Sequence, residues 1–384
     1  MIKNILFVSH TLLMGGGANR SMIQLMVELR DNHGVNPIML APEGQLRPGD
    51  NGLVKECQKL GIPVERAIIP WFLHKNIWLH RAKYIAMWFS YPSLLRTLKK
   101  YDIDMVHSNG SVFDLGARIS RTLGVPHVWH LREFGTEDET VKPVWGENYI
   151  LKAYKKGDAF IAISDAIKKY YNGRISQDKI HRIYNGIDTS KYNKLSVHEN
   201  PRVEFVMVGV VTPHKNQFEA VRAAACLVTK GLTNFHITII GQESLDYANE
   251  IKKYVREHNL SEYVSFLGLR NDVPDLLQKM DIGLMLSKTE AFGRVTIEYM
   301  FQNLAVIGSD TGANPELIED GRTGLLYHFG DEKELAQKMQ ALIENKQKLV
   351  SIAEEGRKFA LDTFPSIKNS DAVFSLYKQL LSDR

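Results

Sequence analysis

Cysteine is nearly absent from this chain: only Cys57 and Cys226 occur among its 384 residues. These two residues supply neither a disulfide framework nor a Cys-x-x-Cys metal or redox site. Such a composition is typical of proteins in a reducing compartment, and we expect a cytoplasmic location.

Long apolar runs are missing as well. No stretch approaches the roughly 18 apolar residues that span a bilayer, and residues 1–10 lack the apolar stretch and cleavage site of a signal peptide. We therefore expect any contact with a membrane to be peripheral.

Net charge is small, with 48 Lys and Arg against 44 Asp and Glu, but it is unevenly distributed. Residues 1–200 carry 27 bases against 19 acids, and much of this excess lies in residues 65–100, where Glu65 is the single acid. Aromatic residues such as Trp78 and Trp88 interleave with these bases. The mixture suits a bilayer surface or an anionic acceptor, and a core-packed helix with a solvated basic edge is the alternative. We do not expect nucleic acid as a partner, because no recognised binding module accompanies the bases.

Short runs rich in Val, Ile and Phe alternate with longer amphipathic stretches, which is the pattern of parallel strands joined by crossover helices. The length favours two domains, so we predict an α/β fold with two doubly wound, Rossmann-like domains, residues 1–190 and 201–365. The polar segment between them predicts a linker. The predicted strands are Ile5–Val8, Asn36–Leu40, Met105–His107, His127–His130, Ala159–Ile163, Glu204–Gly209, His236–Ile240, Val264–Leu267, Ile282–Leu286 and Ala305–Ile307.

One segment carries most of the chemistry. Residues 287–300 follow a predicted strand directly, so they lie at the carboxyl end of a parallel strand, where open α/β sheets bind ligands. If a helix begins near Phe292, Glu290 precedes it and Glu298 lies two turns in. Eight residues at ~1.5 Å each separate the two backbones by ~12 Å, about the span of a sugar, a diphosphate and a ribose. The free amides of the first helical turn favour an anion, and Gly293 lets phosphate oxygens approach the backbone.

The residues that follow this segment point to a family. They contain an apolar strand, a glycine turn, Pro315-Glu316 and Asp320-Gly321-x-x-Gly324. The whole stretch resembles the signature of the family-4 retaining glycosyltransferases (glycosyl transferases group 1). The resemblance implies the GT-B fold, in which two Rossmann-like domains face each other across a cleft. The first domain, with a C-terminal helix in residues 366–384, would bind the acceptor, and the second would bind a nucleotide sugar.

The resemblance assigns roles to residues of the second domain. Glu290 contacts the donor sugar, Glu298 contacts the ribose, and backbone amides around Phe292, Gly293, Arg294 and Val295 hold the diphosphate. After the first strand of this domain, Gly209 approaches the donor and Lys215 neutralises the departing diphosphate.

Two positions depart from the family pattern. Val210 stands where the family often has an arginine, so either Lys215 carries the charge alone or Arg294 substitutes. The pair Gly312-Ala313 replaces two adjacent glycines.

In the first domain the resemblance maps three further residues. Gly17, at the end of the turn Met14-Gly-Gly-Gly17, approaches the donor phosphate, and a tight turn without ligand is the alternative. His130 hydrogen-bonds a hydroxyl of the transferred sugar, unless its ring is satisfied by the backbone. Arg132 meets an anionic group of the acceptor.

Together these residues predict a retaining glycosyltransferase that moves a sugar from a nucleotide-diphosphate donor to a glycan or a lipid-linked acceptor. No metal is expected, and the nucleotide sugar is a co-substrate in place of any cofactor. A sugar-nucleotide epimerase or hydrolase, with Glu133 or Asp165 as an additional carboxylate, is an alternative, and so is a non-catalytic binding protein. A glycosidase is disfavoured, because those mechanisms need two carboxyl groups within roughly 10 Å across one bond.

Overall fold

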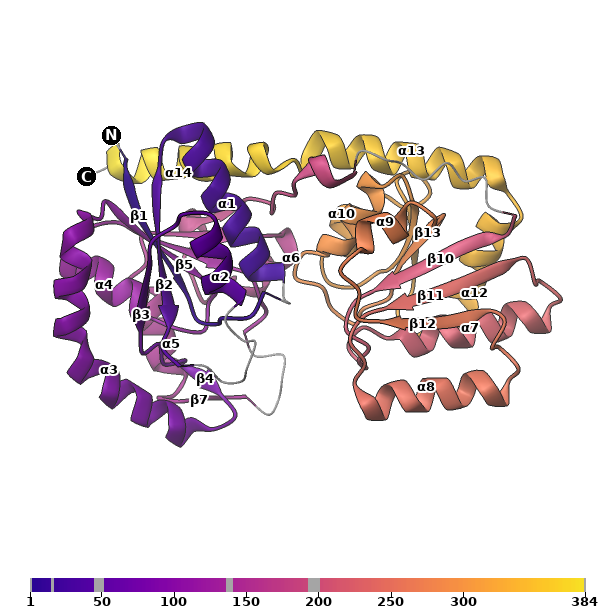
Figure 1. The fold of residues 1–384 in the computed structure, drawn as a ribbon, viewed down its shortest axis with the longest axis horizontal. Coiled ribbons are helices and arrows are strands. Elements are labelled where there is room, and N and C mark those ends of the chain that lie inside the picture. Colours follow the sequence, from indigo (N-terminus) through magenta and orange to yellow (C-terminus); the bar gives the residue numbers. More distant parts are fainter. Residues whose placement is uncertain (1, 15–16, 45–51, 136–140, 193–200, 383–384) are drawn as a thin grey trace. The chain divides into compact units, whose positions relative to one another are not determined.

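The structure is a computed structural model that describes residues 2–14, 17–44, 52–135, 141–192 and 201–382. The chain forms two compact units, each described here by itself. The first unit comprises residues 1–187 and 366–384, and the second comprises residues 188–365 (Figure 1).

The first unit is built on a seven-stranded parallel sheet with the strand order β3-β2-β1-β5-β6-β8-β9. Its strands are β1 (Asn4–Ser9), β2 (Asn36–Pro42), β3 (Val64–Ala67), β5 (Met105–Asn109), β6 (His127–Leu131), β8 (Ala159–Ala162) and β9 (Ile180–Arg182). A separate antiparallel pair consists of β4 (Leu73–His74) and β7 (Lys142–Pro143). Its helices are α1 (Gly17–His33), α2 (Gly52–Lys59), α3 (Ile77–Leu98), η1 (Lys99–Tyr101), α4 (Leu115–Leu123), α5 (Glu147–Tyr154), α6 (Asp165–Tyr170), η2 (Gln177–Lys179) and α14 (Ser366–Ser382).

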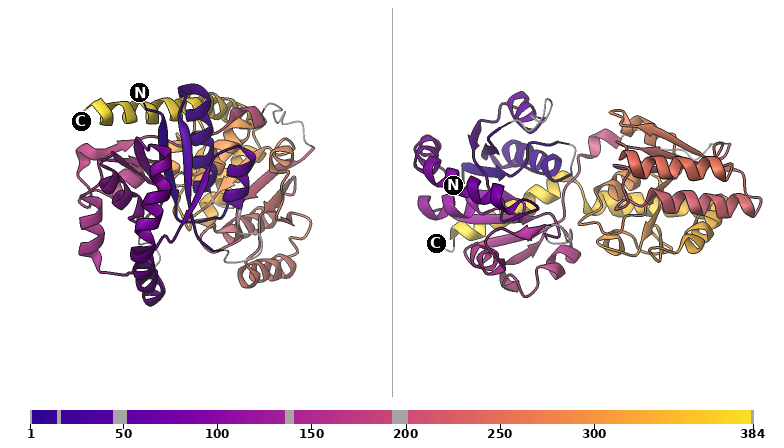
Figure 2. Two further views of the ribbon diagram at one scale, coloured as in Figure 1. Left: turned by 60° about the vertical axis from the view of Figure 1, so that its left-hand side comes forward. Right: turned by 90° about the horizontal axis from the view of Figure 1, so that it is seen from below.

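Alternate residues of the central strand face opposite sides of this sheet. Ile5 and Phe7 pack in a core formed with α1, α2 and α14, whereas Leu6 and Val8 pack with α3 and α4. Helices therefore cover both faces (Figures 1 and 2), which explains why strands such as β1, β2 and β8 are mostly apolar.

The C-terminal helix α14 is an integral part of the first unit. Val373, Leu376 and Tyr377 lie in the same core as α1, and the side-chain amide of Asn369 donates to the carbonyl of Tyr184 at 2.5 Å. The chain thus leaves the first unit near Ile187 and returns to it at Ser366.

The second unit is built on a six-stranded parallel sheet with the order β12-β11-β10-β13-β14-β15. Its strands are β10 (Val203–Val208), β11 (Phe235–Ile240), β12 (Val264–Gly268), β13 (Ile282–Met285), β14 (Ala305–Ser309) and β15 (Leu325–Tyr327). Its helices are η3 (Thr189–Tyr192), α7 (Gln217–Thr229), α8 (Leu245–Glu257), α9 (Val273–Leu277), α10 (Arg294–Phe301), α11 (Asn314–Leu317), α12 (Glu332–Ile343) and α13 (Lys346–Thr363).

The predicted α/β class with two Rossmann-like halves is confirmed, and each of the ten predicted strands overlaps an observed one. The prediction missed β3, β9 and β15, which are edge strands of only three or four residues. So few residues give too short an apolar run to be recognised as a strand.

Candidate functional site

The second sheet reverses its strand order between β10 and β13, so the loops after these two strands diverge at its carboxyl edge. Lys215 lies in the loop after β10 and Glu290 in the loop after β13. The two loops are tied together because the amide of Lys288 donates to the carbonyl of His214 at 2.9 Å. The ammonium of Lys215 forms an ion pair with the carboxylate of Glu290, and both side chains are largely buried. The structure thus brings together two of the predicted catalytic residues at a ligand-binding position of the fold.

Gly293 marks the start of α10. Its φ of +78° is in the left-handed region, and a Cβ there would lie 3.0 Å from Leu317 Cδ1 and 3.3 Å from Thr296 Oγ1. The helix begins at Arg294, two residues later than predicted. Helical rise therefore applies only to the four residues from Arg294 to Glu298, about 6 Å. The expected ~12 Å assumed a helix through most of the segment from Glu290 to Glu298, so helix geometry does not support it.

Two buried polar atoms near Gly293 escaped the sequence analysis. Thr296 Oγ1 and Asn314 Oδ1 are buried near its Cα, and neither has a hydrogen-bond partner among the residues that the structure describes. Buried polar groups are normally hydrogen-bonded, so this pair is suited to a polar ligand at the start of α10. Asn314 directly precedes the Pro315-Glu316 motif. This position next to the motif was the one feature of the sequence that could have identified it.

Glu298 is also paired within the site. Its carboxylate accepts a hydrogen bond from Arg294 Nε at 2.9 Å, one helical turn earlier. Tyr192 adjoins it, and burial together with the Glu298 charge raises the pKa of Tyr192. Arg294 therefore forms an ion pair with Glu298 in this structure. It is the residue expected to substitute for the arginine that the family often has at the position of Val210, and Val210 itself is half exposed.

The structure explains the departure at Gly312-Ala313. Gly312 has a φ of +57°, and a Cβ there would lie 2.4 Å from the backbone nitrogen of Glu290. Ala313 has an ordinary helical φ of −87°, and its amide donates to the carbonyl of Glu290 at 2.8 Å. Only the first position of the pair requires glycine, and both positions hold the Glu290 loop.

Polar groups hold Asn216, the residue that follows Lys215. Asn216, which has a left-handed φ of +59°, donates through its side chain to Glu219, and the hydroxyl of Tyr327 donates to the same carboxylate at 2.8 Å. Burial raises the pKa of Glu219. A Cβ at Gly209 would make ordinary contact with the Lys215 side chain, whose carbons would lie 3.8 Å away. The sequence analysis missed Gly241, where a Cβ would lie 1.9 Å from the Gly209 carbonyl oxygen.

In the first unit the strand order reverses between β1 and β5. Gly17 is the first residue of α1 and is exposed, whereas Gly15 and Gly16 of the predicted turn lie outside the described residues. The buried side chain of Asn19 holds the loop before α1, because it donates to the carbonyl of Leu13 at 2.9 Å.

His130 lies in a chain of buried hydrogen bonds. Arg132 can only donate, so His130 Nδ1, at 3.2 Å from the guanidinium, is an acceptor. Burial and the Arg132 charge hold the pKa of His130 well below its usual value, so the ring is neutral and carries its proton on Nε2. His107 Nε2 then donates to His130 Nδ1 at 3.1 Å, and the hydroxyl of Tyr377 donates to His107 Nδ1 at 2.6 Å. His130 Nε2 is buried and has no partner within the described residues.

Arg132 is buried, with its guanidinium bound to the side chains of Asn109 and Asn185 as well as to His130. That placement favours a role in positioning His130 over the predicted contact with an acceptor. The two additional carboxylates are also engaged: Glu133 accepts from the amide of Ser111 at 2.6 Å, and Asp165 lies 3.6 Å from Arg182.

The basic, aromatic stretch forms β3, β4 and the exposed helix α3. Trp78, Trp88 and Phe89 are 71%, 62% and 84% exposed. None of the described helices is both long enough and apolar enough to cross a bilayer. Across the described part of the chain, His, Cys, Asp and Glu side chains form no cluster of three that could hold a metal ion.

Comparisons with known proteins agree with the fold and the site. The sequence model of the family described as "Glycosyltransferase Family 4" matches residues 15–191, and that of "Glycosyl transferases group 1" matches residues 188–359. An uncharacterised glycosyltransferase of Methanocaldococcus jannaschii is 25% identical over 300 residues, which are 75% of this chain and 81% of that protein. The UDP-Gal:α-D-GlcNAc-diphosphoundecaprenol α-1,3-galactosyltransferase of Escherichia coli is 26% identical over 313 residues, 76% of this chain and 79% of the relative.

Solved structures share the whole fold. HepE of Anabaena, crystallised with UDP, has a TM-score of 0.79 at 22% identity, with 98% of this chain and 100% of that chain covered. Sucrose-phosphate synthase of Thermosynechococcus elongatus has a TM-score of 0.76 at 17% identity, and both chains are covered completely. Two family models together match residues 15–359, both halves are Rossmann-like as in the GT-B neighbours, and the glutamate signature follows β13. The chain therefore belongs to the group 1, family-4 glycosyltransferases.

Proposed function

We propose that this chain is a retaining, metal-independent glycosyltransferase that moves a sugar from a nucleotide-diphosphate donor to a glycan or a lipid-linked acceptor. One observation carries the proposal: the Lys215–Glu290 ion pair lies at the switch point of the second sheet, one loop before α10. HepE, solved with UDP and with UDP-glucose, supports a nucleotide-sugar donor. The E. coli relative, named for a diphosphoundecaprenol acceptor, supports a lipid-linked one.

The second unit would bind the donor. Glu290 accepts hydrogen bonds from sugar hydroxyls and Glu298 from ribose hydroxyls, since an ionised carboxylate only accepts. The diphosphate lies against the amides that begin α10, where Gly293 leaves the backbone open. As the bond to the sugar breaks, negative charge develops on the leaving oxygen, and Lys215 stabilises it.

Retention follows if the leaving phosphate itself takes the proton of the acceptor hydroxyl, because the incoming and departing groups then lie on the same face of the sugar. In the first unit, His130 offers a neutral Nε2–H donor to a sugar hydroxyl, and Gly17 lets a phosphate approach the start of α1. The proposal also includes a cytoplasmic location and a peripheral contact with a membrane through residues 65–100, because α3 exposes large apolar side chains beside bases.

The test compares Lys215→Met with Lys288→Met, which removes an equal charge from an exposed position of the Glu290 loop. We expect turnover with a nucleotide sugar to fall roughly 100- to 1,000-fold in the first variant and little in the second. Turnover should resist chelation by EDTA, and NMR of the product should show a retained anomer. Equal turnover in the two variants would reject the assigned role of Lys215. Donor incubated without acceptor separates transfer from the epimerase alternative, which would convert the donor alone.

A further inference from the structure

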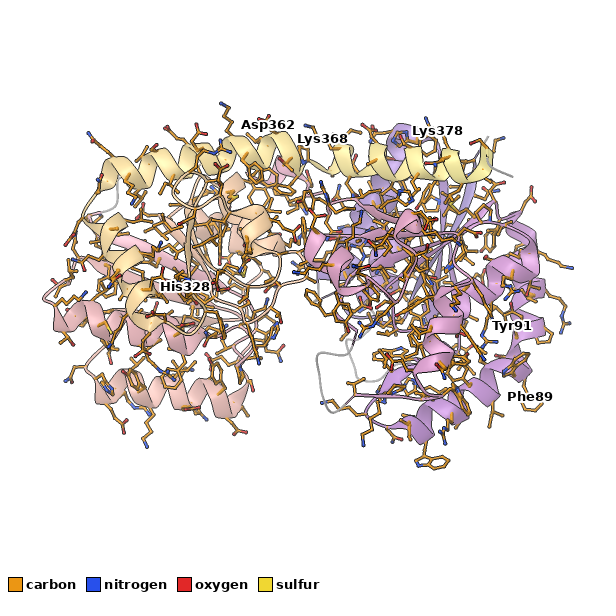
Figure 3. All side chains as sticks on the ribbon, turned by 180° about the vertical axis from the view of Figure 1, so that it is seen from behind. Phe89, Tyr91, His328, Asp362, Lys368 and Lys378 are labelled. Atoms are coloured by element: carbon orange, nitrogen blue, oxygen red, sulfur yellow. The ribbon has the colours of Figure 1, made fainter. Side chains whose placement is uncertain are left out.

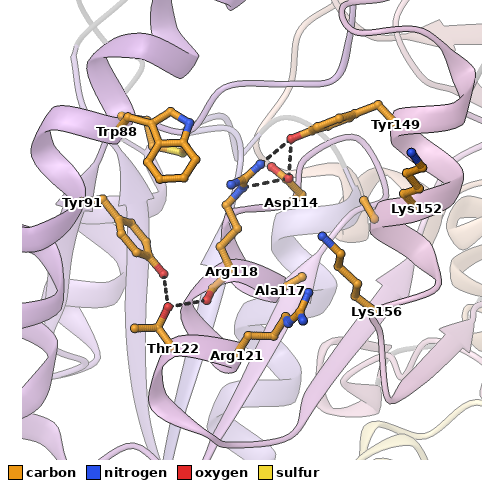
Figure 4. Close-up of a pocket in the computed structure, with 12 residues that line it drawn as sticks. Trp88, Tyr91, Asp114, Ala117, Arg118, Arg121, Thr122, Tyr149, Lys152 and Lys156 are labelled. Atoms are coloured by element: carbon orange, nitrogen blue, oxygen red, sulfur yellow. Dashed lines mark hydrogen bonds and ion pairs between the residues drawn. The ribbon is translucent and has the colours of Figure 1, made fainter.

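A pocket of about 470 Å³ lies in the first unit, on the helical layer formed by α3, α4 and α5 (Figure 4). His130 and Gly17 are not among the residues that line it. Side chains of α3 form one wall, with Trp88 and Tyr91, and α5 with the residues just after it forms the opposite wall, with Lys152 and Lys156.

The inner part of the pocket is neutral and hydrogen-bonded. Asp114 pairs with Arg118 at 2.9 Å and accepts a hydrogen bond from the Tyr149 hydroxyl at 2.8 Å. Burial, followed by the Asp114 charge, raises the pKa of Tyr149 to about 12, so this phenol stays protonated. The guanidinium of Arg118 also lies 5.5 Å over the ring of Trp88. Asp114 is thereby neutralised by Arg118.

The outer part is cationic. Of the described residues that line the pocket, four are Arg or Lys and one is a carboxylate, Asp114. Because Asp114 is paired with Arg118, it does not neutralise the other cations. Three positive charges therefore lie at the mouth of the pocket, on the exposed side chains of Arg121, Lys152 and Lys156. An anionic group with several oxygens complements this arrangement.

The wall on α3 continues into an apolar surface. Trp88 lines the pocket while 62% exposed, and Phe89 and Ile85, which share its side of the helix, are 84% and 58% exposed. Phe89 projects outward from α3 (Figure 3). A cationic pocket whose rim is exposed tryptophan and phenylalanine suits the boundary between lipid headgroups and acyl chains.

We propose that this pocket binds the phosphate of an anionic lipid headgroup at a bilayer surface, with Trp88 and Phe89 inserted beside it. The inference rests on the proposed membrane contact and makes it specific, while it is independent of the donor site. Net charge alone would attract the protein through any basic face, whereas a pocket requires these three cations and these aromatic side chains together.

The experiment measures binding of the full chain to vesicles of phosphatidylcholine, with and without phosphatidylglycerol. The test variant carries Arg121→Gln, Lys152→Gln and Lys156→Gln. The matched control carries Lys55→Gln, Lys59→Gln and Lys169→Gln, which remove the same charge from exposed positions of α2 and α6. We expect a loss of roughly 100-fold on anionic vesicles in the test variant, since each cation at an anionic surface contributes about fivefold. The control should lose much less.

A second arm tests insertion. Trp88→Ser with Phe89→Ser should weaken binding to anionic vesicles. Tryptophan fluorescence should shift to the blue on vesicle binding in the wild type, and this shift should be smaller in the variant that lacks Trp88. Equal losses in the two triple variants, or binding to inorganic phosphate that matches binding to vesicles, would overturn the proposal. Donor binding should persist in the pocket variants and fail in Lys215→Met, so failure of the pocket and failure of the transferase assignment are distinguishable.

Discussion

Replacement of Gly312 by alanine tests how the Glu290 loop is held. The new Cβ would lie 2.4 Å from the backbone nitrogen and 2.6 Å from the carbonyl oxygen of Glu290, closer than real Cβ atoms approach. A left-handed φ costs an L residue about 1–2 kcal/mol, and overpacking adds roughly 1–3 kcal/mol. We expect Gly312→Ala to lower the free energy of unfolding by about 2–5 kcal/mol.

The contact can be relieved only by movement of backbone, and the Glu290 loop is the neighbour that must move. A displacement of about 1 Å at a substrate-positioning group lowers turnover on the order of 100-fold, which is the loss we expect for this variant. Gly231→Ala is the matched control, because Gly231 has a φ of +81° but open space around its Cβ position. It should cost only the conformational 1–2 kcal/mol and keep full turnover. If the two variants have the same free energy of unfolding and the same turnover, the close approach of Gly312 to Glu290 contributes neither to stability nor to catalysis.

Two further predictions concern the first unit. Tyr377→Phe removes the donor to buried His107, so we expect a loss of about 1–3 kcal/mol in stability, and ¹⁵N NMR should show the Nε2–H form of His107 in the wild type and a mixture of His107 tautomers in the variant, while His130 keeps its Nε2–H form because Arg132 still donates to Nδ1; an unchanged His107 tautomer would contradict the hydrogen-bond chain. Burial lowers the pKa of His127 to about 3 and those of His107 and His130 well below the usual value. Below pH 6.5 these three histidines therefore bind protons only in the unfolded state, and the free energy of unfolding decreases as the pH is lowered. Each ring contributes up to about 1.4 kcal/mol per pH unit, and tryptophan fluorescence, which comes only from residues 71–145 of this unit, should report an earlier denaturant midpoint at pH 5.5 than at pH 7.5; equal midpoints would contradict this reasoning.

The sequence sufficed for the central strands and for the glutamate segment. Strands covered on both faces can hold continuous apolar runs, so a run such as Ile5–Val8 stands out from the amphipathic helices around it. The glutamate segment follows β13 immediately, and its place at the carboxyl edge then follows from the topology of parallel sheets.

The supporting contacts could not be predicted, because they join residues far apart in the chain and leave no periodic pattern. Tyr377 and His107 are 270 positions apart, and Lys215 and Glu290 are 75 apart. Such buried polar pairs depend on where loops meet once the sheet has formed. The same holds for Gly241, whose need for glycine arises from the carbonyl of Gly209 on the neighbouring strand's loop.

The two ion pairs of the second unit constrain how the proposed donor would bind. The cations expected to face the diphosphate, Lys215 and Arg294, are each bound to a carboxylate expected to face hydroxyls, Glu290 and Glu298. A diphosphate that draws Lys215 away frees Glu290 as a hydrogen-bond acceptor, and the sugar hydroxyls then satisfy the carboxylate that would otherwise remain unpaired. A free sugar supplies no charge to replace Glu290 at Lys215, so it cannot open the pair by itself. Under the proposed function, sugar recognition by Glu290 would therefore depend on the phosphate that Lys215 binds, and the site would select a sugar joined to a diphosphate over either part alone.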